Sequence, residues 1–141
     1  MGRFSVEVDL ANYDDLALAR AGVILAEKVR RLRIRGVVDS GATRLVLPES
    51  AARQLGLEFS SIATVRYANG QKAERSVAQG IHLVYGGREG VFSAVIEPNR
   101  ESALIGAIVM EELDFLVDCG KQMLVPRDPD RVISEIESLT A

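Results

Sequence analysis

Apolar and polar side chains alternate near the start of the chain. In the stretch FSVEVDL every second residue is apolar: Phe4, Val6, Val8 and Leu10. Side chains two residues apart in a strand lie on the same face. This pattern therefore predicts a strand with one buried face. Residues 31–35 alternate in the same way, with Leu32 and Ile34 inward and arginines outward, and predict a second strand.

Helical patterns are shorter and fewer. The stretch PESAARQLG, residues 48–56, has a proline suited to a first helical turn and a glycine suited to a helix end. Residues 11–29 are rich in Ala and Leu, which suits a helix, but Gly22 leaves a strand pair around that glycine as an alternative. The C-terminal stretch predicts an amphipathic helix from four apolar residues at helical spacing: Val132, Ile133, Ile136 and Leu139.

Turn residues separate the remaining apolar runs. Asn69–Gly70 is the strongest two-residue hairpin signal, and Gly86–Gly87 and residues 119–121 predict two further hairpins. The stretch ALIGAIVMEELDF combines the end of a buried strand, Gly106 and a helix of about two turns. The whole pattern indicates a mainly β chain with two or three short helices, arranged as a small barrel or sandwich.

Composition narrows the function classes. The 141 residues suit one domain, and 48% hydrophobic residues suffice for a core. His82 is the sole histidine of the sequence, which argues against a His-ligated metal and a Ser/His triad. Cys119 is the sole cysteine, which argues against a disulfide within the chain. The net charge of −3, and arginines that fit the solvent face of a strand, argue against nucleic-acid binding. No apolar run approaches a membrane span, and no signal peptide is recognisable, so we expect a cytoplasmic protein.

The candidate chemistry lies in VVDSGATRLVLP, where Asp39 follows a buried strand. Ser40 and Gly41 allow a tight turn whose backbone N–H groups can point at the carboxylate. A carboxylate held in this way is rigid and partly desolvated, as acid–base chemistry requires. The alternative is an Asx-type turn at the surface, since Asp-Ser-Gly is common in turns.

In this motif the chain resembles the retropepsin-like (clan AA) aspartic protease family, of the bacterial type. The family pattern is two apolar residues, Asp, Thr or Ser, Gly, Ala, and Thr or Ser, and residues 37–43 read VVDSGAT. An apolar strand and short helix follow in RLVLPESAARQLGL, and a glycine-containing flap hairpin in VRYANGQKA. Leu-Ile-Gly at residues 104–106 precedes a helix, and FLVDCGKQMLVP supplies C-terminal strands. The resemblance covers roughly residues 30–126.

The resemblance implies a mainly β, small closed acid-protease barrel, and we assign this domain to residues 1–126. The helical spacing at the end of the chain adds a C-terminal helical extension at 127–141. It implies an aspartic endopeptidase that hydrolyses peptide bonds with a water activated by two Asp39 carboxyls across a homodimer axis. Its substrate would be a peptide or protein, and it would need no cofactor or metal. The alternative is a non-catalytic module on the same fold that dimerises or binds peptides.

The resemblance also implies residue roles. Asp39 would be catalytic, Ser40 would link to the partner loop, and the rest of the active-site loop would shape it: Gly41, Ala42 and Thr43. The flap would contain Asn69 and Gly70 at its tip. Tyr67 would cap a cleft from the flap or pack on a cross-strand neighbour. The landmark before the helix comprises Leu104, Ile105 and Gly106.

A second Asp-x-Gly sequence lies near the end of the chain. Asp118-Cys119-Gly120 partly repeats Asp39-Ser40-Gly41. One interpretation is a catalytic pair within a single chain, and the other is a plain hairpin turn. The turn is favoured, because two lobes of such a short chain would each be very small and Lys121 stands where the family has Ala.

Overall fold

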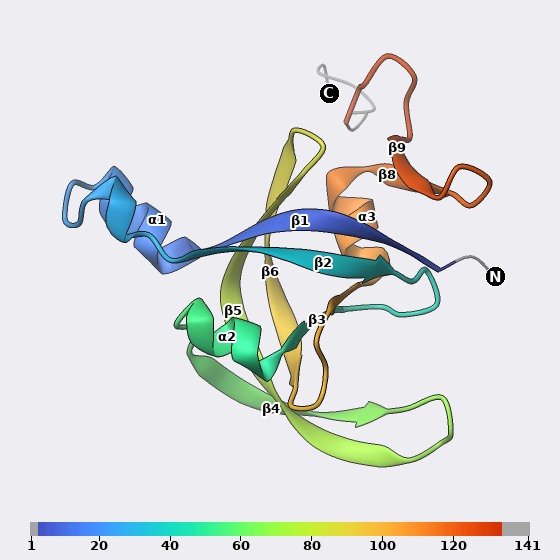
Figure 1. Cartoon of the computed structure of the whole chain (residues 1–141), viewed down its shortest axis with the longest axis horizontal. Coiled ribbons are helices and arrows are strands. Elements are labelled where there is room, and N and C mark those ends of the chain that lie inside the picture. The colour runs from blue at the N-terminus through green and yellow to red at the C-terminus, as the bar shows by residue number, and fades with distance from the viewer. Residues whose placement is uncertain (1–2, 134–141) are drawn as a thin grey trace, which may run out of the picture.

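The fold is a closed β-barrel, seen in a computed structural model that describes residues 3–133 (Figure 1). Pairing runs in the order β1-β2-β7-β3-β6-β5, and β1 also pairs with β5, which closes the ring. The barrel strands are β1 (Phe4–Asn12), β2 (Arg31–Val38), β3 (Leu45–Pro48), β5 (Lys72–Tyr85), β6 (Arg88–Glu97) and β7 (Ala103–Ile105). The mainly β, closed-barrel prediction is confirmed.

The other elements surround this ring. β4 (Phe59–Arg66) pairs only with β5, and β8 (Phe115–Asp118) pairs with β9 (Met123–Pro126) in a separate two-stranded sheet. In the described part of the chain the helices are α1 (Tyr13–Arg20), α2 (Glu49–Gln54), α3 (Ala107–Leu113) and a 3-10 turn, η1 (Ala26–Lys28). Within residues 3–133, none of these helices has the length and apolar character to cross a membrane.

Most predicted elements are present, with local differences. Residues 13–20 form a helix, so the strand pair around Gly22 is not what the chain adopts. Pro48 is the last residue of β3 and the N-cap residue of α2. Its backbone is extended (ψ 146°), so it precedes the first helical turn, in which the sequence placed it. Of the predicted C-terminal helix, Val132 and Ile133 are described and are not helical, and the residues from 134 onward lie outside the described residues.

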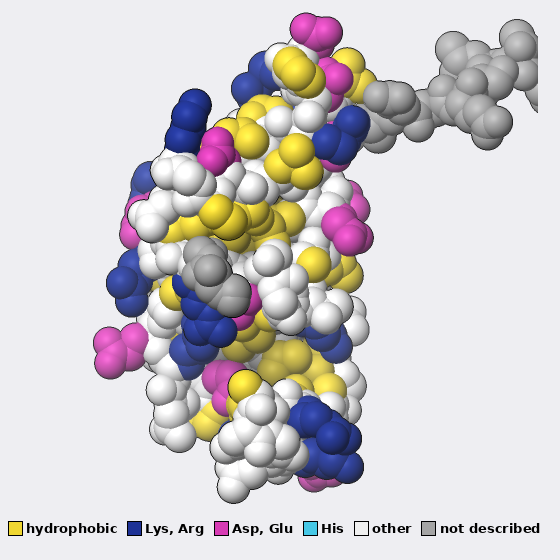
Figure 2. Space-filling view, turned by 90° about the vertical axis from the view of Figure 1, so that its right-hand side faces the viewer, with side chains coloured by type: hydrophobic (Ala, Val, Ile, Leu, Met, Phe, Trp, Pro, Cys, Tyr) yellow, Lys and Arg dark blue, Asp and Glu magenta, His cyan; other side chains and the backbone are white. Residues whose placement is uncertain are grey.

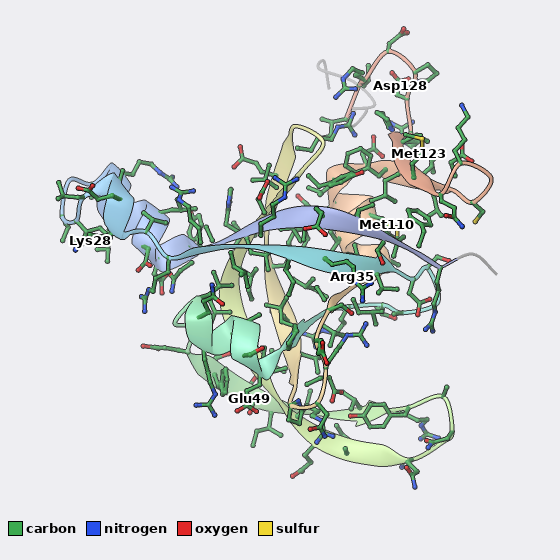
Figure 3. All side chains as sticks on the ribbon, viewed as in Figure 1. Lys28, Arg35, Glu49, Met110, Met123 and Asp128 are labelled. Atoms are coloured by element: carbon green, nitrogen blue, oxygen red, sulfur yellow. The ribbon has the colours of Figure 1, made fainter. Side chains whose placement is uncertain are left out.

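The core is built from the buried face of the alternating strands. Phe4, Val8 and Leu10 are buried, whereas the arginines of β2 face solvent. The α3 helix buries Met110 against this core (Figure 3). Burial of such apolar surface is the main driving force of folding, and here it closes the barrel around Leu45, Leu47 and Leu83.

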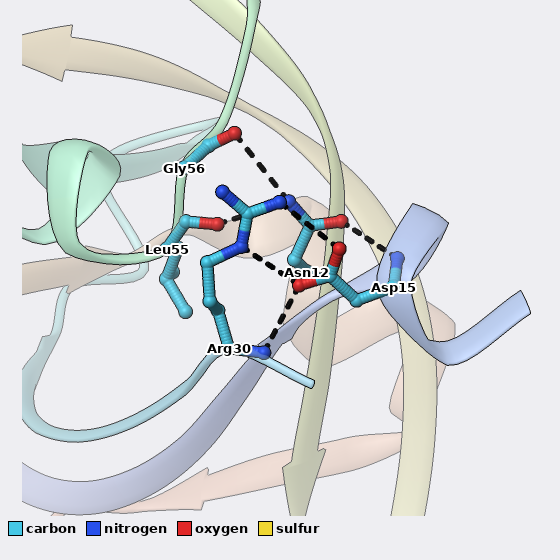
Figure 4. A network of polar contacts seen from close by, with 5 residues as sticks. All are labelled: Asn12, Asp15, Arg30, Leu55 and Gly56. Carbon is cyan, nitrogen blue, oxygen red and sulfur yellow. Dashed lines mark hydrogen bonds and ion pairs between the residues drawn. The ribbon is translucent and has the colours of Figure 1, made fainter. Parts of the chain in front are cut away.

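A polar network attaches the α1 segment to the end of α2 (Figure 4). Asn12 accepts a hydrogen bond from the Asp15 N–H at 3.0 Å and donates to the Leu55 carbonyl at 2.9 Å. The Arg30 Nε donates to Asp15 at 2.8 Å, and a second guanidinium nitrogen donates to its other oxygen at 3.0 Å. The side-chain hydrogen bonds from Arg30 lower the pKa of Asp15, against the opposing effect of burial.

This network predicts an acid-sensitive contribution to stability. At pH 7, Asp15→Asn lowers the free energy of unfolding by about 1–3 kcal/mol, because charged hydrogen bonds to Arg30 are lost. Because the pKa of Asp15 is lowered in the folded protein, its carboxylate stabilises the fold fully at pH values above the pKa of the unfolded chain, about 4. That stabilisation disappears as the pH falls through the folded value. In urea denaturation, the difference between wild type and Asp15→Asn therefore shrinks below about pH 4.

The matched control is the exposed neighbour, Asp14→Asn. It removes the same charge without touching Arg30, and we expect a change of less than about 0.5 kcal/mol. A wild-type advantage over Asp15→Asn that stays constant into acid would contradict the assignment.

Candidate active site

Asp39 is the first residue after β2, at the start of a tight loop. Its backbone N–H donates to the Ile105 carbonyl at 3.1 Å, and its carbonyl accepts from the Ala42 N–H at 3.1 Å. The Gly41 N–H donates to the Asp39 Oδ1 at 2.9 Å. This last bond is that of an Asx turn. The local turn is therefore common to both sequence interpretations, and the surroundings of Asp39 distinguish them.

The loop is held from behind by the start of α3. The Ala107 N–H donates to the Ala42 carbonyl at 2.8 Å, and the Ile108 N–H donates to the Thr43 carbonyl at 2.9 Å. These are N–H groups of the first helical turn, which have no partner inside the helix. β7 runs parallel to β2, with Ile105 opposite Val38. The Leu-Ile-Gly landmark thus lies directly beneath the Asp39 loop.

Gly106 allows this close approach. A Cβ atom at this position would lie 2.4 Å from the Arg44 carbonyl oxygen and 2.7 Å from its nitrogen. Its backbone is extended, with φ −89° and ψ −179°, so the requirement is for space. The glycine therefore permits α3 to begin directly against the loop.

The Asp39 side chain is only 18% exposed, and its Oδ2 lies 3.0 Å from an Arg3 guanidinium nitrogen. Arg3 is 69% exposed. Exposed ion pairs contribute about 0–1 kcal/mol. The carboxylate is therefore held mainly by the loop, and Arg3 is a readily displaced partner.

A cavity of about 640 Å³ lies next to this loop. Its apolar lining includes Val46, Val65, Val95 and Leu104, and the loop contributes Gly41, Ala42 and Thr43. Its other lining residues are polar or charged: Arg44, Arg66, Tyr67, Glu97, Asn99 and Arg100. In Figure 2, which looks onto this side of the molecule, hydrophobic side chains are exposed in a hollow with Lys and Arg beside them.

The β4–β5 hairpin covers the cavity, and we call residues 59–78 of this hairpin the flap. The Tyr67 hydroxyl donates to the Glu97 Oε2 at 2.7 Å, and the Arg75 Nε donates to the other oxygen at 3.0 Å. The Arg75 guanidinium also lies 5.8 Å from the centre of the Tyr67 ring. The pKa of Tyr67 is raised, chiefly by this hydrogen bond to Glu97. Tyr67 therefore ties the flap to β6 while packing beside Arg75.

The sequence-predicted residues are only partly gathered at the cavity. Gly41, Ala42, Thr43, Tyr67 and Leu104 line it. Ser40 is exposed on the loop, and Asn69 and Gly70 are exposed at the flap tip. The predicted hairpin is present, but its turn spans residues 67–71 because β4 ends at Arg66 and β5 begins at Lys72.

Sequence reasoning did not find four charged residues of the cavity: Arg44, Arg66, Glu97 and Arg100. They come from separate segments, and no motif or periodicity connects them. Among residues 3–133, no group of three His, Cys, Asp or Glu side chains is placed to hold a metal ion.

Asp118 occupies a different environment. It ends β8, and its Oδ1 accepts the Lys121 N–H at 3.0 Å. This geometry is that of a hairpin turn in the separate β8–β9 sheet. Neither aspartate is itself a lining residue of the cavity, but Gly41, Ala42 and Thr43 of the Asp39 loop line it and no residue of the Asp118 turn does.

Comparisons with known proteins agree with this architecture. Residues 27–109, more than half of the chain, match the aspartyl protease family. The structure is similar to the protease of the virus EIAV in complex with the inhibitor HBY-793, with a TM-score of 0.54 at 12% identity, over 79% of this chain and 88% of that one. A weaker match is the foamy viral protease-reverse transcriptase in complex with an RNA/DNA hybrid (TM-score 0.46, 17% identity, 55% of this chain and 10% of that one).

No curated protein sequence matches the chain. The bacterial type remains a prediction. The retroviral-protease fold agrees with the family match, and the family match supports a peptidase. The chain belongs to the aspartyl protease family.

Proposed function

We propose that the protein is an aspartic endopeptidase that acts as a homodimer, with Asp39 of each subunit at the shared active site. One observation carries the proposal. In a member of this family, the Asp39 carboxylate is held by the Gly41 N–H beside a flap-covered cavity. The fold supplies one such loop per chain, and the chemistry requires two carboxyl groups.

The reaction follows from two carboxyls that share one proton, which belongs to the pair. The ionised carboxylate accepts a proton from water, and the oxygen of that water attacks the peptide carbonyl carbon. The protonated carboxyl donates a hydrogen bond to the carbonyl oxygen as negative charge develops there. Collapse of the tetrahedral intermediate breaks the C–N bond, and a proton passes from the pair to the leaving nitrogen.

A twofold axis would bring two copies of the Asp39 loop together. Among the described residues, Arg3 is the one cation that forms an ion pair with the Asp39 carboxylate. The Arg3 side chain is highly exposed, so a second subunit could readily displace it. The β8–β9 sheet exposes Leu116 and Met123, which a second subunit could cover. An extended peptide would then lie between the flap and the apolar cavity lining, with strand-like backbone hydrogen bonds.

Subunit mixing tests the shared active site. Wild type and Asp39→Asn are combined in equal amounts, unfolded and refolded together, and assayed for peptide cleavage at fixed total protein. If each active site needs two Asp39 carboxyls, random pairing leaves about one quarter of the wild-type activity. Independent subunits would leave about one half.

Sedimentation velocity on the same samples shows whether dimers form. A cleaving monomer, or a mixture that retains half the activity, would contradict the proposal. A dimer that binds peptides but cleaves none would favour the non-catalytic module.

A further inference from the structure

The cavity carries more positive charge than the rest of the molecule. The chain has a net charge of −3, yet the cavity lining contains three arginines and a single acidic residue, Glu97. Arg75 pairs with Glu97 at 3.0 Å. The negative charge of Glu97 is therefore already balanced, and the lining arginines add uncompensated positive charge.

None of the three lining arginines, Arg44, Arg66 and Arg100, has a carboxylate partner within ion-pair distance among residues 3–133. In Arg44 a terminal guanidinium nitrogen is already engaged, because it donates to the Ser93 hydroxyl at 2.8 Å. Arg66 ends β4 in the flap, and Arg100 lies in the turn between β6 and β7. Both arginines therefore line the same cavity, Arg66 from the flap and Arg100 from the β6–β7 turn.

Arg100 is held in place and partly removed from water. Its Nε donates to the Ser102 carbonyl at 2.7 Å, which leaves its two terminal nitrogens for another acceptor. The pKa of Arg100 is lowered, first by burial and second by the positive charge of Arg3. The negative charges of Glu97 and Asp39 act in the opposite direction. Arg100 lines the same cavity as Gly41 and Ala42, which follow Asp39 in the loop, and this places it near the proposed reaction centre.

We propose that Arg100, with Arg66 of the flap, binds an acidic side chain of the substrate next to the scissile bond. This inference rests on the proposed peptidase function and gives it a substrate class: peptides or proteins with Asp or Glu beside the cleavage site. A carboxylate would compensate a partly desolvated guanidinium, and such charged pairs are the strong class of hydrogen bond. A lysine at the same substrate position would meet two like charges.

The test uses three peptides that differ only in Glu, Gln or Lys, placed in turn at each position flanking a cleaved bond. For wild type we expect kcat/KM at one position to be roughly tenfold higher for Glu than for Gln, and lower still for Lys. The preference weakens as salt is raised, because added ions screen the attraction. Arg100→Gln removes most of it, and Arg100→Glu shifts the preference toward Lys.

Arg35→Gln is the matched control. It removes the same charge from the exposed face of β2, outside the cavity lining (Figure 3). We expect Arg35→Gln to keep the wild-type ratio of Glu to Gln. Since Arg100 also bonds Ser102, its variants could fold poorly. Arg66→Glu, on an exposed part of the flap, then tests the same charge reversal.

Binding to the Asp39→Asn variant separates this inference from the peptidase proposal. Calorimetry with the Glu and Gln peptides measures charge selection without cleavage. If wild type cleaves both peptides equally and the arginine variants change nothing, the inference is overturned while the peptidase stands. If no peptide is cleaved but Asp39→Asn still prefers Glu through Arg100, the peptidase fails and the charge selection stands. If neither cleavage nor preferential binding occurs, both are overturned.

Discussion

Asp39→Asn abolishes peptide cleavage and leaves the barrel folded. Asparagine keeps a side-chain oxygen for the Gly41 N–H, so the loop retains its turn. It cannot exchange a proton with water or with a second carboxyl, so the acid–base step is lost. We expect kcat to fall on the order of 10⁴-fold, as for other single catalytic residues. Loss of the exposed Arg3 pair changes the free energy of unfolding by about 1 kcal/mol or less.

Asp118→Asn is the matched control for this experiment. It makes the same substitution in the other Asp-x-Gly sequence, where the side chain accepts a hydrogen bond from the Lys121 N–H of its own turn. We expect wild-type cleavage from this variant. If Asp118→Asn also abolished cleavage, the pair of carboxyls would lie within one chain, and the homodimer proposal would fail. An Asp39→Asn protein that cuts at the wild-type rate would end the assignment of Asp39.

Gly106→Ala has the largest expected effect on stability. The new Cβ would lie within 2.7 Å of backbone atoms of Thr43 and Arg44, which cannot move aside as a flexible side chain can. Either α3 or the Asp39 loop must shift, and we expect a loss of about 3 kcal/mol in the free energy of unfolding. Cleavage should fall as well, because α3 positions the loop through Ala42 and Thr43.

Gly120→Ala provides the comparison. Its Cβ would lie 3.5 Å from the Asp118 carboxylate oxygen, an ordinary contact. Chemical denaturation of both variants should show a large decrease in midpoint for Gly106→Ala alone. Equal midpoints would show that the loop and α3 can separate at little cost, and that the contact does not fix the active-site geometry.

Several elements could be predicted because their causes lie within a few residues. Alternation predicted the strand that begins at Phe4, and the glycine pair predicted the turn between β5 and β6. Gly86 and Gly87 both adopt positive φ, 60° and 80°, which glycine allows without strain. The Asp39 loop was also recognisable, since its tight turn needs small residues at successive positions.

Other elements depend on distant contacts. Residues 13–20 form a helix whose cap and anchor join Asn12 and Asp15 to Arg30 and to the end of α2. Nothing within residues 11–29 alone could show that arrangement. Tyr67 likewise bonds Glu97, 30 residues away, rather than only a cross-strand neighbour.

The sequence by itself determined the mainly β character of the chain, the short helices before and after the predicted flap, and Asp39 as the candidate acid. These depend on side-chain alternation and turn residues, which act locally. Only the tertiary structure decided that Arg66, Glu97 and Arg100 share one cavity with the Asp39 loop. Closure of the barrel sets those distances, and electrostatic interaction depends on separation in space rather than along the chain.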